Sequence, residues 1–187
     1  MIRVVVTGSE CTGKTSLAKA LSEQFGTPYV PEYAREFVRE KGESPVHRDV
    51  AAIARGQVAL EDSLIAGAPR VLIQDTDLLS TVVYSRHYYS DCPGRVEEAL
   101  ADRGADLYLL ADIDVPWVAD GDQRDRGERR EEMHALFRQA LVERGLRFVE
   151  VSGSRGERLR LAVDAIDKLL AGAREAGEFG GTNPEDS

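Results

Sequence analysis

The chain has 187 residues, of which 42% are hydrophobic and 30% charged, and its formal net charge is −9. A chain of this length can bury one substantial core, so we expect a single domain. The negative charge disfavours nucleic acid and anionic membrane surfaces as partners, because both are themselves negatively charged. Two cysteines without Cys-x-x-Cys spacing and three histidines make a zinc site a poor interpretation.

The sequence also shows no pattern that is typical of a membrane span or a secretion signal. No apolar run approaches the length that is needed to cross a bilayer. The chain begins directly in a predicted strand, so we expect no signal peptide and a cytoplasmic protein. Composition gives no indication of the oligomeric state.

Short apolar runs alternate with helical patterns along the whole chain. The predicted strands are residues 2–7, 28–31, 70–75, 106–111 and 146–151. The predicted helices are residues 15–25, 33–41, 47–66, 78–88, 93–103 and 131–144, with a last helix that ends near Leu170. Strands that are apolar throughout and alternate with helices indicate an α/β protein with a parallel sheet covered on both faces. We expect residues 1–170 to form the domain and residues 171–187, rich in Gly and Glu, to be a disordered tail.

The loop after the first strand has the spacing G-x-x-x-x-G-K-[ST], between a strand and a helix as this motif requires. Its glycines allow backbone conformations in which successive N–H groups point inward and surround an anion. The helix that follows adds its positive end. We therefore predict that a nucleoside triphosphate binds at these residues: Gly8, Ser9, Glu10, Cys11, Thr12, Gly13, Lys14, Thr15 and Ser16.

Within this motif the two last positions have separate roles. Lys14 is expected to bring a cation to the β- and γ-phosphates, and the hydroxyl of Thr15 to ligate Mg²⁺. The Asn-Lys-x-Asp motif with which GTPases recognise guanine is absent, since the chain has one asparagine, Asn183, near its end. ATP is therefore the expected donor.

Three acids lie at or just past the ends of predicted strands, where ligands gather in parallel sheets: Glu32, Asp75 and Asp112. Asp75 is placed to hold Mg²⁺ opposite the phosphate loop. Asp77 either shares that role or acts on the acceptor hydroxyl, or it caps the next helix. Glu32 either accepts a proton from the acceptor or orients its hydroxyl, with Arg35 one turn further on; alternatively the two form a solvated ion pair.

Four arginines lie close together after the fourth strand, interleaved with glycines: Arg124, Arg126, Arg129 and Arg130. Such a segment suits a kinase lid, because arginine neutralises charge on a transferring phosphoryl group. A solvated charge run is the alternative. Trp117, just before the segment, either stacks on a base or anchors the loop, and Tyr33, Tyr84 and Tyr88 either line an aromatic pocket or pack in the interior.

One motif is misleading. His47, Arg48 and Asp49 spell the start of a protein-kinase catalytic loop, but the required asparagine is replaced by Ala54. No Asp-Phe-Gly sequence accompanies it. We therefore exclude a protein kinase.

Residues 8–15, 31–37, 74–77 and 116–121 together resemble the ribosylnicotinamide kinase domain of bacterial NAD-biosynthesis and regulator proteins. The resemblance extends over residues 2–170. It implies a P-loop fold of three α/β/α layers, with five parallel strands in the order 2-3-1-4-5, as in nucleoside and nucleotide kinases. It also implies ATP-dependent phosphorylation of the 5′-hydroxyl of nicotinamide riboside. Neither the adenylyltransferase domain nor the DNA-binding domain of the bifunctional relatives can be placed here, so we expect a stand-alone kinase.

The expected mechanism follows from these assignments. Lys14 and the loop hold ATP, while Thr15 and Asp75 position Mg²⁺. The acceptor side comprises Glu32 or Asp77 as the group that orients or deprotonates the hydroxyl, with Tyr33, Arg35 and Trp117 as further substrate contacts. Arg124 or Arg129 is expected to neutralise the transferring phosphoryl group. Two other functions stay open: phosphorylation of another nucleoside or nucleotide, and a nucleotide-dependent switch without an acceptor.

Overall fold

The structure is a computed structural model that describes residues 1–67, 69–115 and 129–175. Its five strands form one parallel sheet. The strands are β1 (Ile2–Thr7), β2 (Tyr29–Val30), β3 (Val71–Asp75), β4 (Leu107–Ala111) and β5 (Phe148–Val151). Their order across the sheet is β2-β3-β1-β4-β5, which confirms the predicted order.

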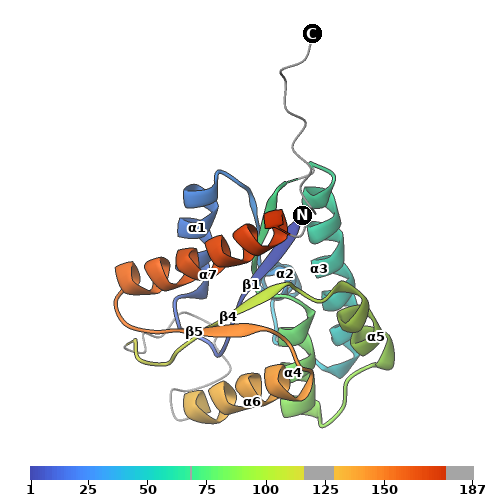
Figure 1. The fold of residues 1–187 in the computed structure, drawn as a ribbon. Coiled ribbons are helices and arrows are strands. Elements are labelled where there is room, and N and C mark those ends of the chain that lie inside the picture. The colour runs from blue at the N-terminus through green and yellow to red at the C-terminus, as the bar shows by residue number, and fades with distance from the viewer. Residues whose placement is uncertain (68, 116–128, 176–187) are drawn as a thin grey trace.

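Helices cover both faces of this sheet, so the fold has three layers (Figure 1). Helices α1 and α7 lie on one face, and α3, α4, α5 and α6 lie on the other. The helices are α1 (Lys14–Phe25), α2 (Tyr33–Lys41), α3 (Val50–Ile65), α4 (Leu78–Tyr89), α5 (Gly94–Arg103), α6 (Arg130–Glu143) and α7 (Arg155–Glu175), with a 3-10 turn, η1 (His47–Asp49), before α3. Within the described ranges, none of these helices combines the length and the apolar character that a membrane span requires.

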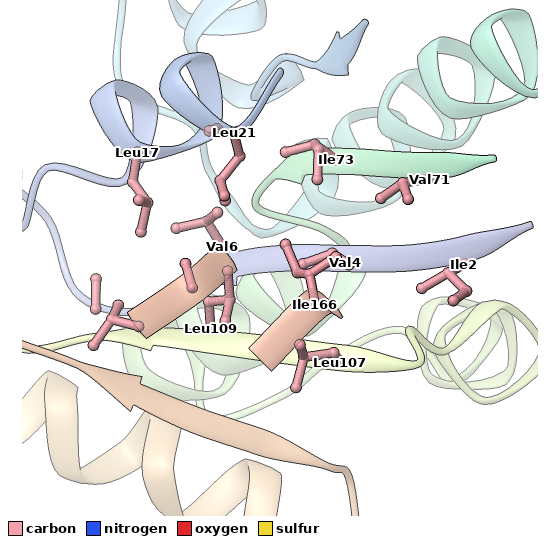
Figure 2. Close-up of a cluster of buried hydrophobic side chains, with 14 of the residues drawn as sticks. Ile2, Val4, Val6, Leu17, Leu21, Val71, Ile73, Leu107, Leu109 and Ile166 are labelled. Carbon is pink, nitrogen blue, oxygen red and sulfur yellow. The ribbon is translucent and has the colours of Figure 1, made fainter. Parts of the chain in front are cut away.

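The central strand β1 explains why the sheet is so firmly buried. Val4, Val5 and Val6 are fully buried, and side chains alternate between the two faces of a strand. Val4 and Val6 pack under α1 and α7 together with Leu17 and Ile166 (Figure 2), whereas Val5 belongs to the cluster on the opposite face. The sheet is thereby fixed from both sides, which gives the loops at its carboxyl edge a rigid base.

Two predicted helix boundaries differ from the structure by more than one residue. The helix expected to begin at His47 starts with the 3-10 turn η1, and α3 itself begins at Val50. The last helix does not end near Leu170 but continues to Glu175, because Leu170 and Ala173 still pack against the core under α7. The tail predicted to be disordered thus begins with helical residues, and residues 176–187 lie outside the described residues.

Candidate functional site

The loop between β1 and α1 has the backbone conformation that a phosphate-binding loop needs. Gly8, Cys11 and Gly13 have positive φ angles of 129°, 54° and 80°. A Cβ atom on Gly8 would lie 2.9 Å from the carbonyl oxygen of Ala111, at the end of β4. Gly8 is therefore required both by its φ angle and by this close approach. Backbone turns of this kind orient successive N–H groups toward an anion.

Lys14 is buried at the start of α1, with an exposed fraction of 7%. Its Nζ donates a 2.7 Å hydrogen bond to the carbonyl oxygen of Ser9, within the loop. Burial lowers the pKa of Lys14, and the nearby carboxylates of Glu32 and Asp75 oppose that shift. An anionic phosphate would oppose it in the same way, so the site favours a negatively charged ligand.

Thr15 and Asp75 are in direct contact, as expected for residues that share a metal ion. The Thr15 hydroxyl donates a 2.6 Å hydrogen bond to Oδ2 of Asp75. Oδ1 of Asp75 is buried and makes no hydrogen bond within the described part of the chain. Burial raises the pKa of Asp75, which the hydrogen bond from Thr15 opposes. These oxygens fit Mg²⁺, which binds few protein ligands and takes the rest from phosphate and water; no cluster of three or more His, Cys, Asp or Glu ligands occurs among the described residues.

Two buried arginines bind carbonyl oxygens of the loop: Arg158, which the sequence pattern did not indicate, and Arg130, which belongs to the predicted arginine cluster. Arg158, 5% exposed, donates to the carbonyl oxygens of Thr12 at 2.8 Å, Gly153 at 3.0 Å and Asp112 at 3.0 Å. It also forms an ion pair with the side chain of Asp114. The arginine therefore joins the phosphate loop to the ends of β4 and β5.

The second arginine, Arg130, lies at the start of α6. Its guanidinium donates to the carbonyl oxygens of Val115 at 3.1 Å and Cys11 at 3.4 Å. With the carbonyl oxygens of residues 11 and 12 both bound behind the loop, the next N–H groups face the opposite side, because each peptide is planar. The predicted arginine cluster thus includes one residue that supports the loop.

A cavity of about 400 Å³ opens beside Lys14. Its size suits a small-molecule ligand. Its lining combines charged groups from the phosphate loop and the ends of β2 and β3 with aromatic and aliphatic side chains. The polar lining comprises Glu10, Lys14, Glu32, Arg35, Gln57, Thr76, Asp77, Ser80, Thr81 and Ser85, and the apolar and aromatic lining Ala34, Val38, Pro45, Val50, Ile53, Tyr84, Tyr88 and Tyr89.

Asp77 lines this cavity but also caps α4. Its Oδ1 accepts a 3.0 Å hydrogen bond from the N–H of Leu79, and its Oδ2 accepts one of 2.8 Å from the hydroxyl of Tyr108. Burial raises the pKa of Asp77 to about 6, although both hydrogen bonds oppose this. Asp77 therefore caps α4, which was one of the roles considered for it. Both of its carboxylate oxygens accept hydrogen bonds.

Glu32 also lines the cavity, and its Oε2 accepts a 2.6 Å hydrogen bond from Nε of Arg35. Glu32 and Arg35 thus form the ion pair that was the alternative interpretation, and both residues line the cavity. Tyr33 is not among the residues that line the cavity. Its ring instead packs against Gly56 of α3, where an added Cβ would lie 2.0 Å from its Cε1 atom.

Tyr84 and Tyr88 are stacked, with centroids 6.1 Å apart, and Tyr84 also contacts Phe137 of the core edge-on. These tyrosines therefore line the cavity and pack in the interior at once. Arg129 is exposed just before α6, and Ser16 is exposed on α1. Trp117 and Arg124 lie outside the described residues, so the roles expected for them stay predictions.

The glycine loop, its buried lysine and the parallel sheet define a P-loop nucleotide-binding protein of the α/β class. A family model described as an AAA domain (AAA_28) matches residues 3–158. The chain belongs to this family.

Comparison with known proteins adds named relatives. The chain is similar to the trifunctional NAD biosynthesis/regulator protein NadR of Escherichia coli K12, with 30% identity over 154 residues. That match covers 79% of this chain but 37% of the relative, so the chain spans little more than a third of the relative's length. A crystal structure of NadR in complex with NR has a TM-score of 0.71 and 26% identity, over 89% of this chain and 50% of that one. Another, of NadR with NAD and AMP-PNP, has a TM-score of 0.71 and 27% identity, over 89% and 49%.

Proposed function

We propose that this chain transfers the γ-phosphoryl group of ATP to the 5′-hydroxyl of nicotinamide riboside and so forms nicotinamide mononucleotide. The observation that carries the proposal is one cavity lined by both Lys14 of the phosphate loop and Glu32 at the end of β2. A kinase needs these two groups in one space, because donor phosphate and acceptor hydroxyl must meet in line. The similarity to NadR, and the NadR structures with NR and with AMP-PNP, support this choice of acceptor and donor.

The reaction balances without a further reactant. The 5′-oxygen of the riboside forms a bond to the γ-phosphorus as the bond from that phosphorus to the bridging oxygen of ADP breaks. ADP leaves with the electron pair, and the hydroxyl proton passes to Glu32 or to water. Asp77 is the weaker candidate for this proton, since both of its oxygens accept hydrogen bonds.

The residues of the loop act by position and charge. Lys14 and the loop N–H groups would hold the phosphates, and their positive charge would stabilise the charge that builds on the transferring group. Thr15 and Asp75 would hold Mg²⁺, which neutralises phosphate charge when bound. We assign this kinase unit to residues 1–170, with Arg124 or Arg129 as further sources of positive charge.

The test is turnover of ATP with Mg²⁺ and a panel of acceptors: nicotinamide riboside, the common nucleosides and nucleotides, and no acceptor. We expect turnover with nicotinamide riboside to exceed that with every other acceptor. Turnover with a different nucleoside would retain a kinase and replace the substrate. Turnover that is equal without any acceptor would refute the kinase and favour a nucleotide-dependent switch.

A further inference from the structure

The backbone on either side of Glu32 is held by a single side chain from another helix. Oε1 of Gln57, on α3, accepts a 2.9 Å hydrogen bond from the N–H of Tyr33. Nε2 of the same amide donates a 3.2 Å hydrogen bond to the carbonyl oxygen of Pro31. Glu32 is the residue between these two contacts, so the amide fixes the chain immediately before and immediately after it.

The preceding residue on α3 contacts the same segment. Gly56 lies against the ring of Tyr33 so closely that a Cβ atom would fall 2.0 Å from Cε1 and 2.3 Å from Cδ1. Gly56 does not have the positive φ that would by itself require glycine. The contact with Tyr33 is therefore the reason that a side chain does not fit there. Gly56 and Gln57 together form a docking point for residues 31–33, which we call the Gly56–Gln57 clamp.

Helix α2 depends on this clamp because it contributes no residue to the buried core. Its far end is held by Lys41, whose Nζ donates to Oδ2 of Asp49 at 2.6 Å. At its near end Glu32 is the N-cap residue, yet its carboxylate makes no capping hydrogen bond. The first N–H of a helix has no partner within the helix, and here Gln57 supplies one.

The carboxylate of Glu32 is not used as a helix cap; it lines the cavity, where its Oε2 accepts the hydrogen bond from Nε of Arg35. Glu32 lines that cavity, and its charge acts on Lys14 and on Asp75 across it. Gln57 is itself 4% exposed and lines the same cavity, so a substitution there changes the position of Glu32 without adding a new surface group.

We infer that Gln57, together with Gly56, is a positioning residue for the reaction: the clamp holds Glu32 where its carboxylate meets the acceptor hydroxyl. This inference rests on the proposed kinase function. It adds a residue that acts through Glu32 and not through contact with the nucleotide.

A double-mutant cycle measures whether Gln57 acts through Glu32. The variants are Gln57→Leu, Glu32→Gln and the combination, each assayed for kcat and KM with nicotinamide riboside and with ATP. A small displacement of a catalytic group lowers the reaction rate strongly. We therefore expect Gln57→Leu to lower kcat/KM for the acceptor about 10-fold. In the Glu32→Gln background the same change should lower it less than about 2-fold, since coupled residues are not additive. The KM for ATP should not change.

Gly56→Ala tests the same clamp by steric means and does not remove a hydrogen bond. We expect it to lower kcat for the acceptor as Gln57→Leu does, because the new methyl group must displace the ring of Tyr33. Gly172→Ala is the matched control, since Gly172 also lies in a helix and a Cβ there meets nothing within 4 Å. Thermal melting identifies any variant that does not fold. If Gln57→Leu does not fold, Gly56→Ala replaces it in the double-mutant cycle.

The outcomes separate the inference from the function on which it rests. An equal loss from Gln57→Leu in both backgrounds, or a loss confined to ATP, would overturn the inference while the wild-type kinase stands. If wild type phosphorylates another nucleoside, the cycle is run with that acceptor and the inference is judged on it. A wild-type protein that phosphorylates no acceptor refutes the proposed function and the inference together.

Discussion

The candidate site has two sides that are built from different kinds of group: the phosphate loop with Asp75, and the walls of the cavity beside it. On the phosphate side, formed by residues 8–15 and Asp75, backbone groups surround the ligand site and Arg130 and Arg158 bind the carbonyl oxygens behind them. On the proposed acceptor side, side chains of α2, α3 and α4 form the walls. The first arrangement suits a constant ligand such as a triphosphate, because backbone N–H groups do not depend on residue type. The second can be changed by single substitutions, so specificity is expected to reside there.

The most damaging change should be on the phosphate side. Lys14→Ala removes the buried cation of the loop, and we expect kcat/KM to fall about 10³-fold, as for other preorganised groups that stabilise transition-state charge. The assay is steady-state phosphorylation with saturating acceptor. Lys19→Ala, which changes an exposed lysine on the same helix, should leave the rate unchanged. Near-wild-type turnover by the Lys14 variant would contradict the whole account.

A smaller loss of a different kind is expected on the acceptor side. Glu32→Gln should reduce kcat about 10²-fold, the usual contribution of a general base, while the affinity for ADP stays unchanged. Titration calorimetry with ADP and steady-state kinetics together measure this separation. Glu36→Gln on the same helix is the control, because Glu36 forms a surface pair with Arg39. A Glu32 variant that loses ADP affinity would erase the distinction between the two sides.

Arg158, one of the two arginines that bind carbonyl oxygens of the loop, gives a third test. Arg158→Met should raise the KM for ATP about 10-fold, since a charged hydrogen bond contributes roughly 1.5–3 kcal/mol. The KM for the acceptor should remain within about 2-fold, because Arg158 contacts the phosphate loop and is not among the residues that line the cavity. Arg160→Met is the control, since Arg160 is exposed and pairs with Asp164 across one helical turn.

The fourth test concerns the stability of the fold and belongs to Asp77. The pKa of this carboxyl is about 6 in the folded protein, above its ordinary value of 3.8. The folded protein therefore binds more protons than the unfolded chain between these values, and its stability falls as the pH rises through them. We expect Asp77→Asn to lack this loss. Relative to wild type, the variant should gain about 3 kcal/mol between about pH 4 and pH 7, at roughly 1.4 kcal/mol for each pH unit between the two pKa values, or roughly 6–12 °C in melting temperature. If the difference in stability between wild type and Asp77→Asn does not vary with pH, Asp77 does not carry the proton in this range.

The sequence predicted the phosphate side better than the acceptor side, because the two sides are built from different kinds of group. The loop could be predicted because its glycines, Lys14 and Thr15 act together at a fixed local spacing. The strand order was also available, through the resemblance to a known family. Asp75 could be placed because it ends a strand next to the central one.

The acceptor side could not be predicted as well, because it depends on contacts between distant residues. Nothing near Gln57 in the sequence indicates that its amide binds the backbone at Pro31 and Tyr33. Tyr33 was expected to contact substrate, but Gly56 leaves room for its ring against α3. Arg158 is one of several arginines early in α7, and its contacts at residues 12, 112 and 153 are visible only in three dimensions.

The most direct test of the central claim is the stoichiometry of the products. Nicotinamide riboside, ATP and Mg²⁺ are incubated with the protein, and ADP and nicotinamide mononucleotide are quantified by chromatography with mass spectrometry. We expect one mononucleotide, phosphorylated on the 5′-oxygen, for each ADP formed. ADP that accumulates without a phosphorylated nucleoside would contradict it and leave a nucleotide hydrolase without an acceptor.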